Sequence, residues 1–139
     1  MRAERPMPAP KNLKVLPKDL NGHQVREIME KWAGSLGVHC DTCHAADPNH
    51  MGPNGRPRLD FAADTKHDKL KARIMYTMTQ DINKNYVSMV AEDNDGPQGV
   101  VTCGTCHRGH LKPEVYVIPR EEHHGPEGMP PGGAPPQHN

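Results

Sequence analysis

The chain has 139 residues with 17 basic and 17 acidic side chains, so its formal net charge of zero argues against a nucleic-acid-binding surface. Its length is that of one domain, and no apolar run approaches the length of a transmembrane helix. Hydrophobic residues make up 34%, against roughly 45–50% for a similar residue set in average proteins. We therefore expect that something besides side chains fills the interior, or that much of the chain is unpacked.

Both ends of the chain are rich in proline. Residues 1–18 are predicted to form an extended lead-in, and their first twelve, MRAERPMPAPKN, show no signal peptide. Residues 119–139 hold six prolines and four glycines and few apolar residues, which predicts a flexible tail. The folded domain is accordingly predicted over residues 19–118.

A helix is predicted before the first cysteines. Asn21 is a suitable N-cap, and Gly37 is a suitable residue to end the helix. Between them, apolar residues recur with the spacing of one continuous helical face: Val25, Ile28, Met29, Trp32, Ala33 and Leu36.

A polar loop is predicted over residues 45–60, which are rich in proline, glycine and asparagine. A second helix is predicted to begin near Asp64 or Thr65, because Thr65 and Asp68 have the spacing of a capping box. We expect this helix to reach Val90, since apolar residues recur at four-residue steps along it: Leu70, Ile74, Met78, Ile82 and Tyr86.

Each predicted helix is followed by the pattern C-x-x-C-H, and the two copies contain all four cysteines of the chain. This is the attachment pattern of c-type haem. Two thiols add to the two vinyl groups of the haem, and the adjacent histidine binds the iron from one axial side. The sequence therefore predicts two covalently bound haems c, held by Cys40, Cys43 and His44 and by Cys103, Cys106 and His107.

Three other interpretations explain less of the pattern. A zinc site favours paired C-x-x-C but does not need a histidine after both pairs, and the 59 intervening residues are long for a compact zinc ribbon. A disulfide framework leaves the histidines unexplained. A thioredoxin-like redox pair is expected within a βαβ pattern, which the sequence does not show.

Haem also accounts for the thin apolar composition, because helices can pack against its apolar faces. The predicted fold is mostly α: a small dihaem cytochrome c built from two helix–turn–C-x-x-C-H units, with little or no sheet and extended termini. No pair of strands is convincing, and the β-branched run at 115–118 is isolated.

Each iron has a second axial position, for which methionine and histidine are the candidates. Met29 lies on the apolar face of the first helix, eleven residues before Cys40. With a haem attached beside that helix, a ligand role is favoured over that of a core methionine. The second helix offers Met75, Met78 and Met89, and periodicity does not choose among them.

Three stretches carry a family resemblance: IMEKWAGSLGVHCDTCH, DFAADTKHDKLKARIMYTMTQDINKNY and VVTCGTCHRGHLKP. They resemble the cytochrome subunit of bacterial photosynthetic reaction centres, a tetrahaem protein built from two dihaem halves. The chain is similar to one half. It departs from the family pattern in three ways. It has only one half, its segment 45–60 looks longer than the matching loop of the family, and its tail is unlike the family's.

The resemblance implies that the helix before each motif supplies an axial methionine. The matching positions are Met29 for the first haem and Met75, in preference to Met78, for the second. Arg73 and Arg108 are candidate partners of haem propionates, and plain surface solvation is the alternative role for both.

The expected function is one-electron transfer between redox partner proteins, not catalysis, and no nucleic acid or transmembrane segment is involved. A photosynthetic reaction centre or another membrane electron-transfer complex is the partner that the resemblance implies. The family attaches haem outside the cytoplasm, so a periplasmic or cell-surface location in a bacterium is expected. The alternative is a haem enzyme such as a small dihaem peroxidase, for which the chain looks short.

Overall fold

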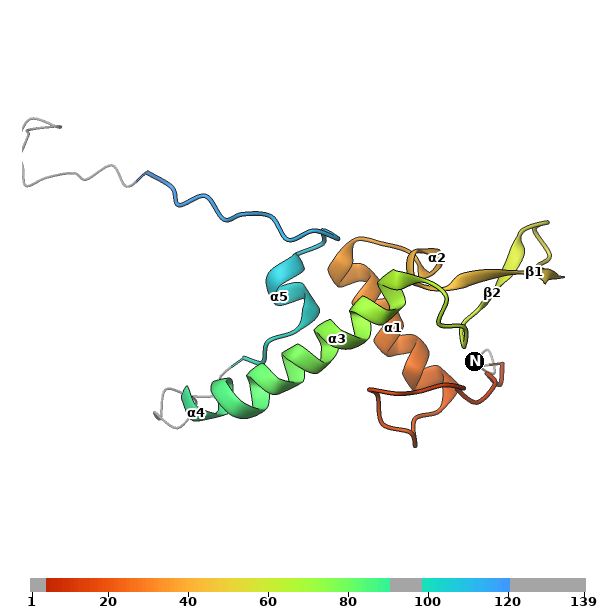
Figure 1. The fold of residues 1–139 in the computed structure, drawn as a ribbon, viewed down its shortest axis with the longest axis horizontal. Coiled ribbons are helices and arrows are strands. Elements are labelled where there is room, and N and C mark those ends of the chain that lie inside the picture. The colour runs from red at the N-terminus through yellow and green to blue at the C-terminus, as the bar shows by residue number, and fades with distance from the viewer. Residues whose placement is uncertain (1–4, 91–98, 121–139) are drawn as a thin grey trace, which may run out of the picture.

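The computed structural model describes residues 5–90 and 99–120 (Figure 1). Residues 1–4 of the predicted lead-in and residues 121–139 of the predicted tail lie outside this range. The described chain is mostly helical and has one small two-stranded antiparallel sheet. The predicted class, a small and mostly α-helical protein, is confirmed.

Helix α1, Gly22–Leu36, begins and ends where the sequence predicts. The side chain of Asn21 accepts a hydrogen bond from the Gln24 N–H at 2.9 Å, and the Asn21 N–H donates to Gln24 Oε1 at 2.9 Å. This reciprocal pair satisfies N–H groups that a helix start leaves without partners. Gly37 ends the helix in the left-handed conformation, with φ 64°.

Each cysteine motif folds as a single short helical turn. Helix α2 is Cys40–Cys43, and helix α5 is Cys103–His107. At the start of α5 the Thr102 N–H donates to Thr105 Oγ1 at 2.9 Å. A turn of this kind places residues one and four of each motif on the same side of the helix.

The prediction of a polar loop at residues 45–60 is wrong, because this segment forms a β-hairpin (Figure 1). Strand β1, Ala45–Met51, pairs antiparallel with β2, Pro57–Asp60. The Gly52 N–H donates to the Arg56 carbonyl at 2.7 Å, and Gly55 takes a left-handed φ of 70° at the tip. Both strands are largely exposed, so they lack the alternation of apolar and polar residues by which strands are predicted.

Helix α3, His67–Ile82, starts later than predicted. The predicted capping box of Thr65 and Asp68 is absent, and the N-cap is Lys66, which makes no side-chain capping bond. Asp64, the other predicted start, is instead held by ion pairs and hydrogen bonds to side chains from two segments. These tertiary contacts keep residues 64–66 outside the helix.

Beyond α3 the chain stays helical to Val90, as predicted. The π-helical turn η1, Asn83–Val87, is followed by α4, Ser88–Val90, and the three form one rod (Figure 1). A π turn inserts an extra residue into a helix and is frequent at functional sites. Here it begins at Asn83, whose side chain contacts the approach to the second motif.

Two contacts hold α1 against the rest of the molecule. Trp32 of α1 packs on Tyr76 of α3, with ring centroids 5.0 Å apart. The end of α1 lies against the loop after α5, where the Gly109 N–H donates to the Ser35 carbonyl at 2.8 Å. A Cβ atom at Gly37 would lie 2.1 Å from the Gly109 carbonyl oxygen, so this approach requires glycine.

We predict that Gly37→Ala destabilises the fold by roughly 2–5 kcal/mol, through left-handed backbone strain and collision with the Gly109 carbonyl. Gly34→Ala is the matched control, because nothing lies within 4 Å of its added Cβ. That change sits inside α1 and should stabilise by up to about 1 kcal/mol. Thermal and urea unfolding of both variants measures the difference. Equal stability of the two variants would contradict the close approach.

Candidate functional site

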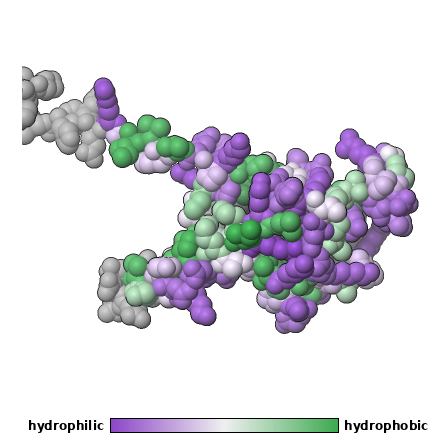
Figure 2. Space-filling model, viewed as in Figure 1, coloured by the Kyte–Doolittle hydropathy of each residue, from purple (hydrophilic) through white to green (hydrophobic). Residues whose placement is uncertain are grey.

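A cavity of about 320 Å³ lies between α1, α3 and α5. Its lining is almost wholly apolar, and Figure 2 shows apolar residues along the notch between α5 and the far half of α3. Its volume falls within the roughly 300–1,000 Å³ of small-molecule and cofactor sites. The apolar walls come from all three helices and the segments beside α5: Trp32, Leu36, Ile74, Ile82, Val101 and Leu111.

The three residues of the second motif line this cavity together. Cys103, Cys106 and His107 all face it. The His107 ring is buried, and its Nδ1 lies 2.9 Å from the His110 carbonyl oxygen. Because a carbonyl only accepts hydrogen bonds, Nδ1 carries the proton, and the lone pair on Nε2 is left for a metal.

Two of the three methionines considered on the second helix reach the cavity. Met75 and Met78 both line it, and their exposed fractions are 37% and 40%. Met89 lies on α4, is 69% exposed and does not line it. Neither position nor exposure separates Met75 from Met78, so the choice of Met75 stays a prediction.

Asn83 fixes the approach to the second motif and was not among the predicted site residues. Its Nδ2 donates to the Val101 carbonyl at 2.8 Å, and the Val101 N–H donates to its Oδ1 at 2.7 Å. One side chain thus pairs both backbone groups of a residue two positions before Cys103. Asn83 lies inside the predicted second helix, two residues before Asn85, and the sequence alone does not show its partner.

The first motif lies on a different wall. Cys43 lines the same cavity, whereas Cys40 is exposed. The half-buried His44 ring packs against Phe61 in an edge-to-face contact, with centroids 5.0 Å apart. Burial lowers the pKa of His44, and the nearby Lys69 and Arg73 lower it further. The lowered pKa favours the neutral imidazole, which is the form that binds a metal.

The remaining predicted residues lie apart from the cavity. Met29 is half-buried on α1 and does not line it. The Arg73 guanidinium lies 2.9 Å from Asp64 Oδ1. Arg108 is exposed, ends α5 with a left-handed φ of 52°, and borders a smaller, more polar cavity of about 310 Å³ beside Glu114.

All four thiols are free. Burial raises the pKa values of Cys43 and Cys103, so these thiols stay protonated near neutral pH. Across residues 5–90 and 99–120, no group of three or more His, Cys, Asp and Glu side chains could hold a metal ion.

Comparison with protein families gives a match over most of the chain. Residues 11–132 match the model of the photosynthetic reaction centre cytochrome C subunit. The chain belongs to this family. A comparison with curated proteins finds no match. The family consists of haem c cytochromes, which transfer electrons with a redox partner complex and are not classed as enzymes.

The residues of this cytochrome fit a haem c at the second motif. Two thiols and a buried imidazole with a fixed tautomer face one apolar cavity, and a thioether side chain stands on the helix α3 that lines it. An apolar ring packs well against such walls, and a hydrogen bond to Nδ1 orients a histidine ligand and fixes its tautomer. No helix in the described part of the chain combines the length and apolar composition of a membrane span.

We predict that Asn83→Ala destabilises the cytochrome by about 2–3 kcal/mol, because it leaves the N–H and C=O of Val101 without partners. Asn83→Asp should cost a similar amount, since a carboxylate oxygen cannot donate to the Val101 carbonyl. The control is Asn85→Ala on the same π turn, whose exposed side chain bonds only Asp81 among the described residues. Chemical unfolding measures the stability of all three variants. An Asn83→Ala variant as stable as the wild type would contradict the stabilising role of the two bonds from Asn83 to Val101.

Proposed function

We propose that this cytochrome binds two haems c covalently and transfers single electrons between redox partner proteins. One haem is attached at Cys40 and Cys43, the other at Cys103 and Cys106. Bound haem supplies an iron that alternates between the ferric and ferrous states. The chain holds the ligands, excludes water and sets the spacing of the two sites.

The observation that carries this proposal is the cavity of the second motif. Its walls are apolar, both thiols of the motif face it, and the buried His107 presents Nε2 as its free nitrogen. Cys43 of the first motif borders the same cavity. Attachment at both motifs thus places two redox groups beside one shared interior, which favours transfer of an electron between them.

Methionines are proposed as the second axial ligands: Met29 at the first haem and Met75 at the second. Support comes from the family resemblance, and for Met75 also from its place on the cavity wall. A histidine and a methionine on one iron favour the ferrous form and raise the potential, as suits an electron carrier.

The proposed partner is a membrane electron-transfer complex, either a photosynthetic reaction centre or another complex of that kind. The proposed location is the periplasm or cell surface of a bacterium, where the family attaches its haem. Family membership supports both statements. Recovery of the haem-loaded protein from the cytosolic fraction would contradict the location.

We predict that the intact mass after denaturation exceeds the polypeptide mass by two haems. Replacing Cys103 and Cys106 together by alanine should remove one haem, and replacing Cys40 and Cys43 together should remove the other. Mass spectrometry with the pyridine haemochrome spectrum gives the count. A wild-type mass equal to the bare chain, or to the chain with one haem, would end the two-haem proposal.

We predict that Met75→Leu removes half of the near-infrared charge-transfer band of methionine bound to ferric iron, and that Met29→Ala removes the other half. Met78→Leu is the matched control, one turn along α3 on the same cavity. It should leave the band whole and cost less than about 1.5 kcal/mol in packing. Loss of half the band in Met78→Leu with an intact band in Met75→Leu would show that Met78 is the ligand.

A further inference from the structure

We propose that Asp64 sets the redox potential of the haem at the first motif, by neutralising part of a cluster of cations that is connected to His44 through Lys69 and Phe61. The inference rests on the proposed haem at Cys40 and Cys43. It assigns to Asp64 a role in tuning this haem without binding it.

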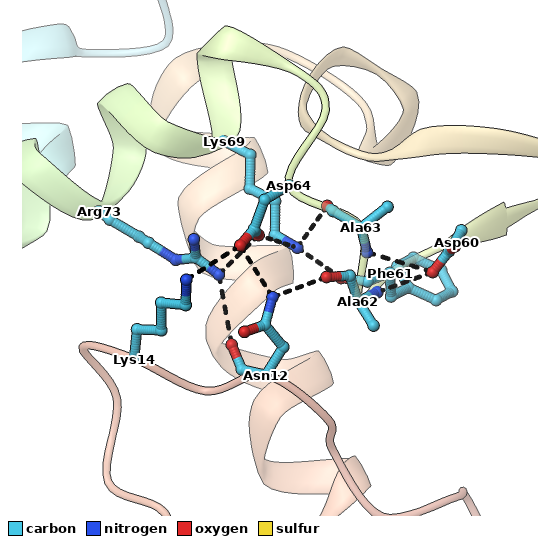
Figure 3. A network of polar contacts seen from close by, with 9 residues as sticks. All are labelled: Asn12, Lys14, Asp60, Phe61, Ala62, Ala63, Asp64, Lys69 and Arg73. Carbon is cyan, nitrogen blue, oxygen red and sulfur yellow. Dashed lines mark hydrogen bonds and ion pairs between the residues drawn. The ribbon is translucent and has the colours of Figure 1, made fainter.

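Asp64 is the centre of a polar cluster drawn from two distant parts of the chain (Figure 3). Its Oδ1 lies 2.9 Å from Arg73 Nη2 and 3.0 Å from Lys69 Nζ, both on α3. Its Oδ2 lies 3.2 Å from Lys14 Nζ and accepts a hydrogen bond from Asn12 Nδ2 at 3.0 Å. One carboxylate therefore faces three cations.

The cluster is tied to the lead-in by Asn12. This residue has a left-handed φ of 68°, which asparagine tolerates better than most residues. Its side chain also donates to the Ala62 carbonyl at 2.7 Å, and its own carbonyl accepts from Arg73 at 3.3 Å. Lys14 follows two residues later, so the lead-in delivers the third cation to a fixed place.

The same cluster reaches the first motif through Lys69 and Phe61. Lys69 Nζ donates to the Phe61 carbonyl at 2.8 Å and to the Ala63 carbonyl at 2.7 Å. The Phe61 ring packs on the His44 ring. Lys69 thus joins the cluster to the residue whose ring packs on His44.

Solvent screens this field only in part. The side chains of Lys69 and Arg73 are 11% and 15% exposed, whereas Lys14 is 56% exposed. Charges that are mostly buried interact more strongly than those in water. The three cations and Asp64 sum to a net charge of +2, and loss of the carboxylate would leave +3.

The sign of the effect follows from the charge of the iron. The ferric state carries one more positive charge than the ferrous state, so nearby cations favour ferrous iron and raise the potential. Asp64 opposes them and lowers it. A structural ion pair alone would alter stability when broken, but it would not shift the potential in a direction set by the charge removed.

The first experiment is spectroelectrochemical titration of the two-haem protein and its Asp64→Asn variant. The potential of one haem should rise, with the ferrous-to-ferric ratio at fixed potential increasing about tenfold, which equals about 59 mV for one electron. The responding haem should be the one that is absent when Cys40 and Cys43 are both replaced by alanine. The other haem should shift less.

Opposite charge changes should act in the opposite direction. Arg73→Gln should lower the same potential, and Asp64→Asn combined with Arg73→Gln should return it toward the wild-type value. Lys14→Gln should lower it by a smaller amount, and its exposed side chain makes this variant safe for folding. The matched control is Asp81→Asn, an exposed carboxylate farther along α3, which should leave both potentials unchanged.

Lys14→Gln is measured together with each of Asp64→Asn and Arg73→Gln that folds. The role of Asp64 is refuted if these variants leave the potential of the first haem unchanged, or shift the potentials of both haems equally. A shift in redox potential caused by Asp81→Asn that is as large as the shift caused by Asp64→Asn would also refute it. Failure of the proposed function looks different, because the wild-type chain would then carry no haem at the first motif. Haem content is measured before each titration.

Discussion

A cavity stands where a protein of this size would normally have its hydrophobic core. Leu16 is the one buried hydrophobic residue among those described, whereas α1, α3 and α5 turn apolar side chains toward a shared space of about 320 Å³. Hydrophobic burial is the main favourable term in folding, so a chain with this little internal packing needs an apolar group to complete it. Haem c is such a group, and its covalent attachment makes the completion permanent.

The close approach of Gly37 and Gly109 helps to position the two motifs relative to each other in a protein with so small a core. Gly37 ends α1 three residues before Cys40, and Gly109 lies two residues after His107. Their contact therefore fixes the entry to the first motif against the exit from the second. Asn83 performs a related task for the entry to the second motif, since it holds Val101 beside the end of α3. Close backbone packing and side-chain hydrogen bonds to the backbone, not a large apolar core, thus align the two motifs.

Local signals were enough to predict the elements that local chemistry determines. Asn21 and Gly37 bound α1 as expected, because a capping side chain and a left-handed glycine act within one helical turn. The start of α3 was wrong because Asp64 binds Lys14 and Arg73, which sequence distance hides. The hairpin at 45–60 was missed because its exposed strands lack an apolar face. The role of Asn83 was missed since its partner lies 18 residues away.

The choice of the iron ligands shows how far geometry alone extends. Met75 and Met78 lie one turn apart, line the same cavity and are exposed to nearly the same degree. Helical periodicity and the fold therefore give the same answer, a methionine on this face of α3, and only the family resemblance separates the two. The proposed ligand His107 is more narrowly constrained, because its hydrogen bond to the His110 carbonyl fixes which ring nitrogen stays free. The free nitrogen of a hydrogen-bonded histidine follows from the fold, whereas the role of a flexible methionine follows only from a measurement of its bond to the iron.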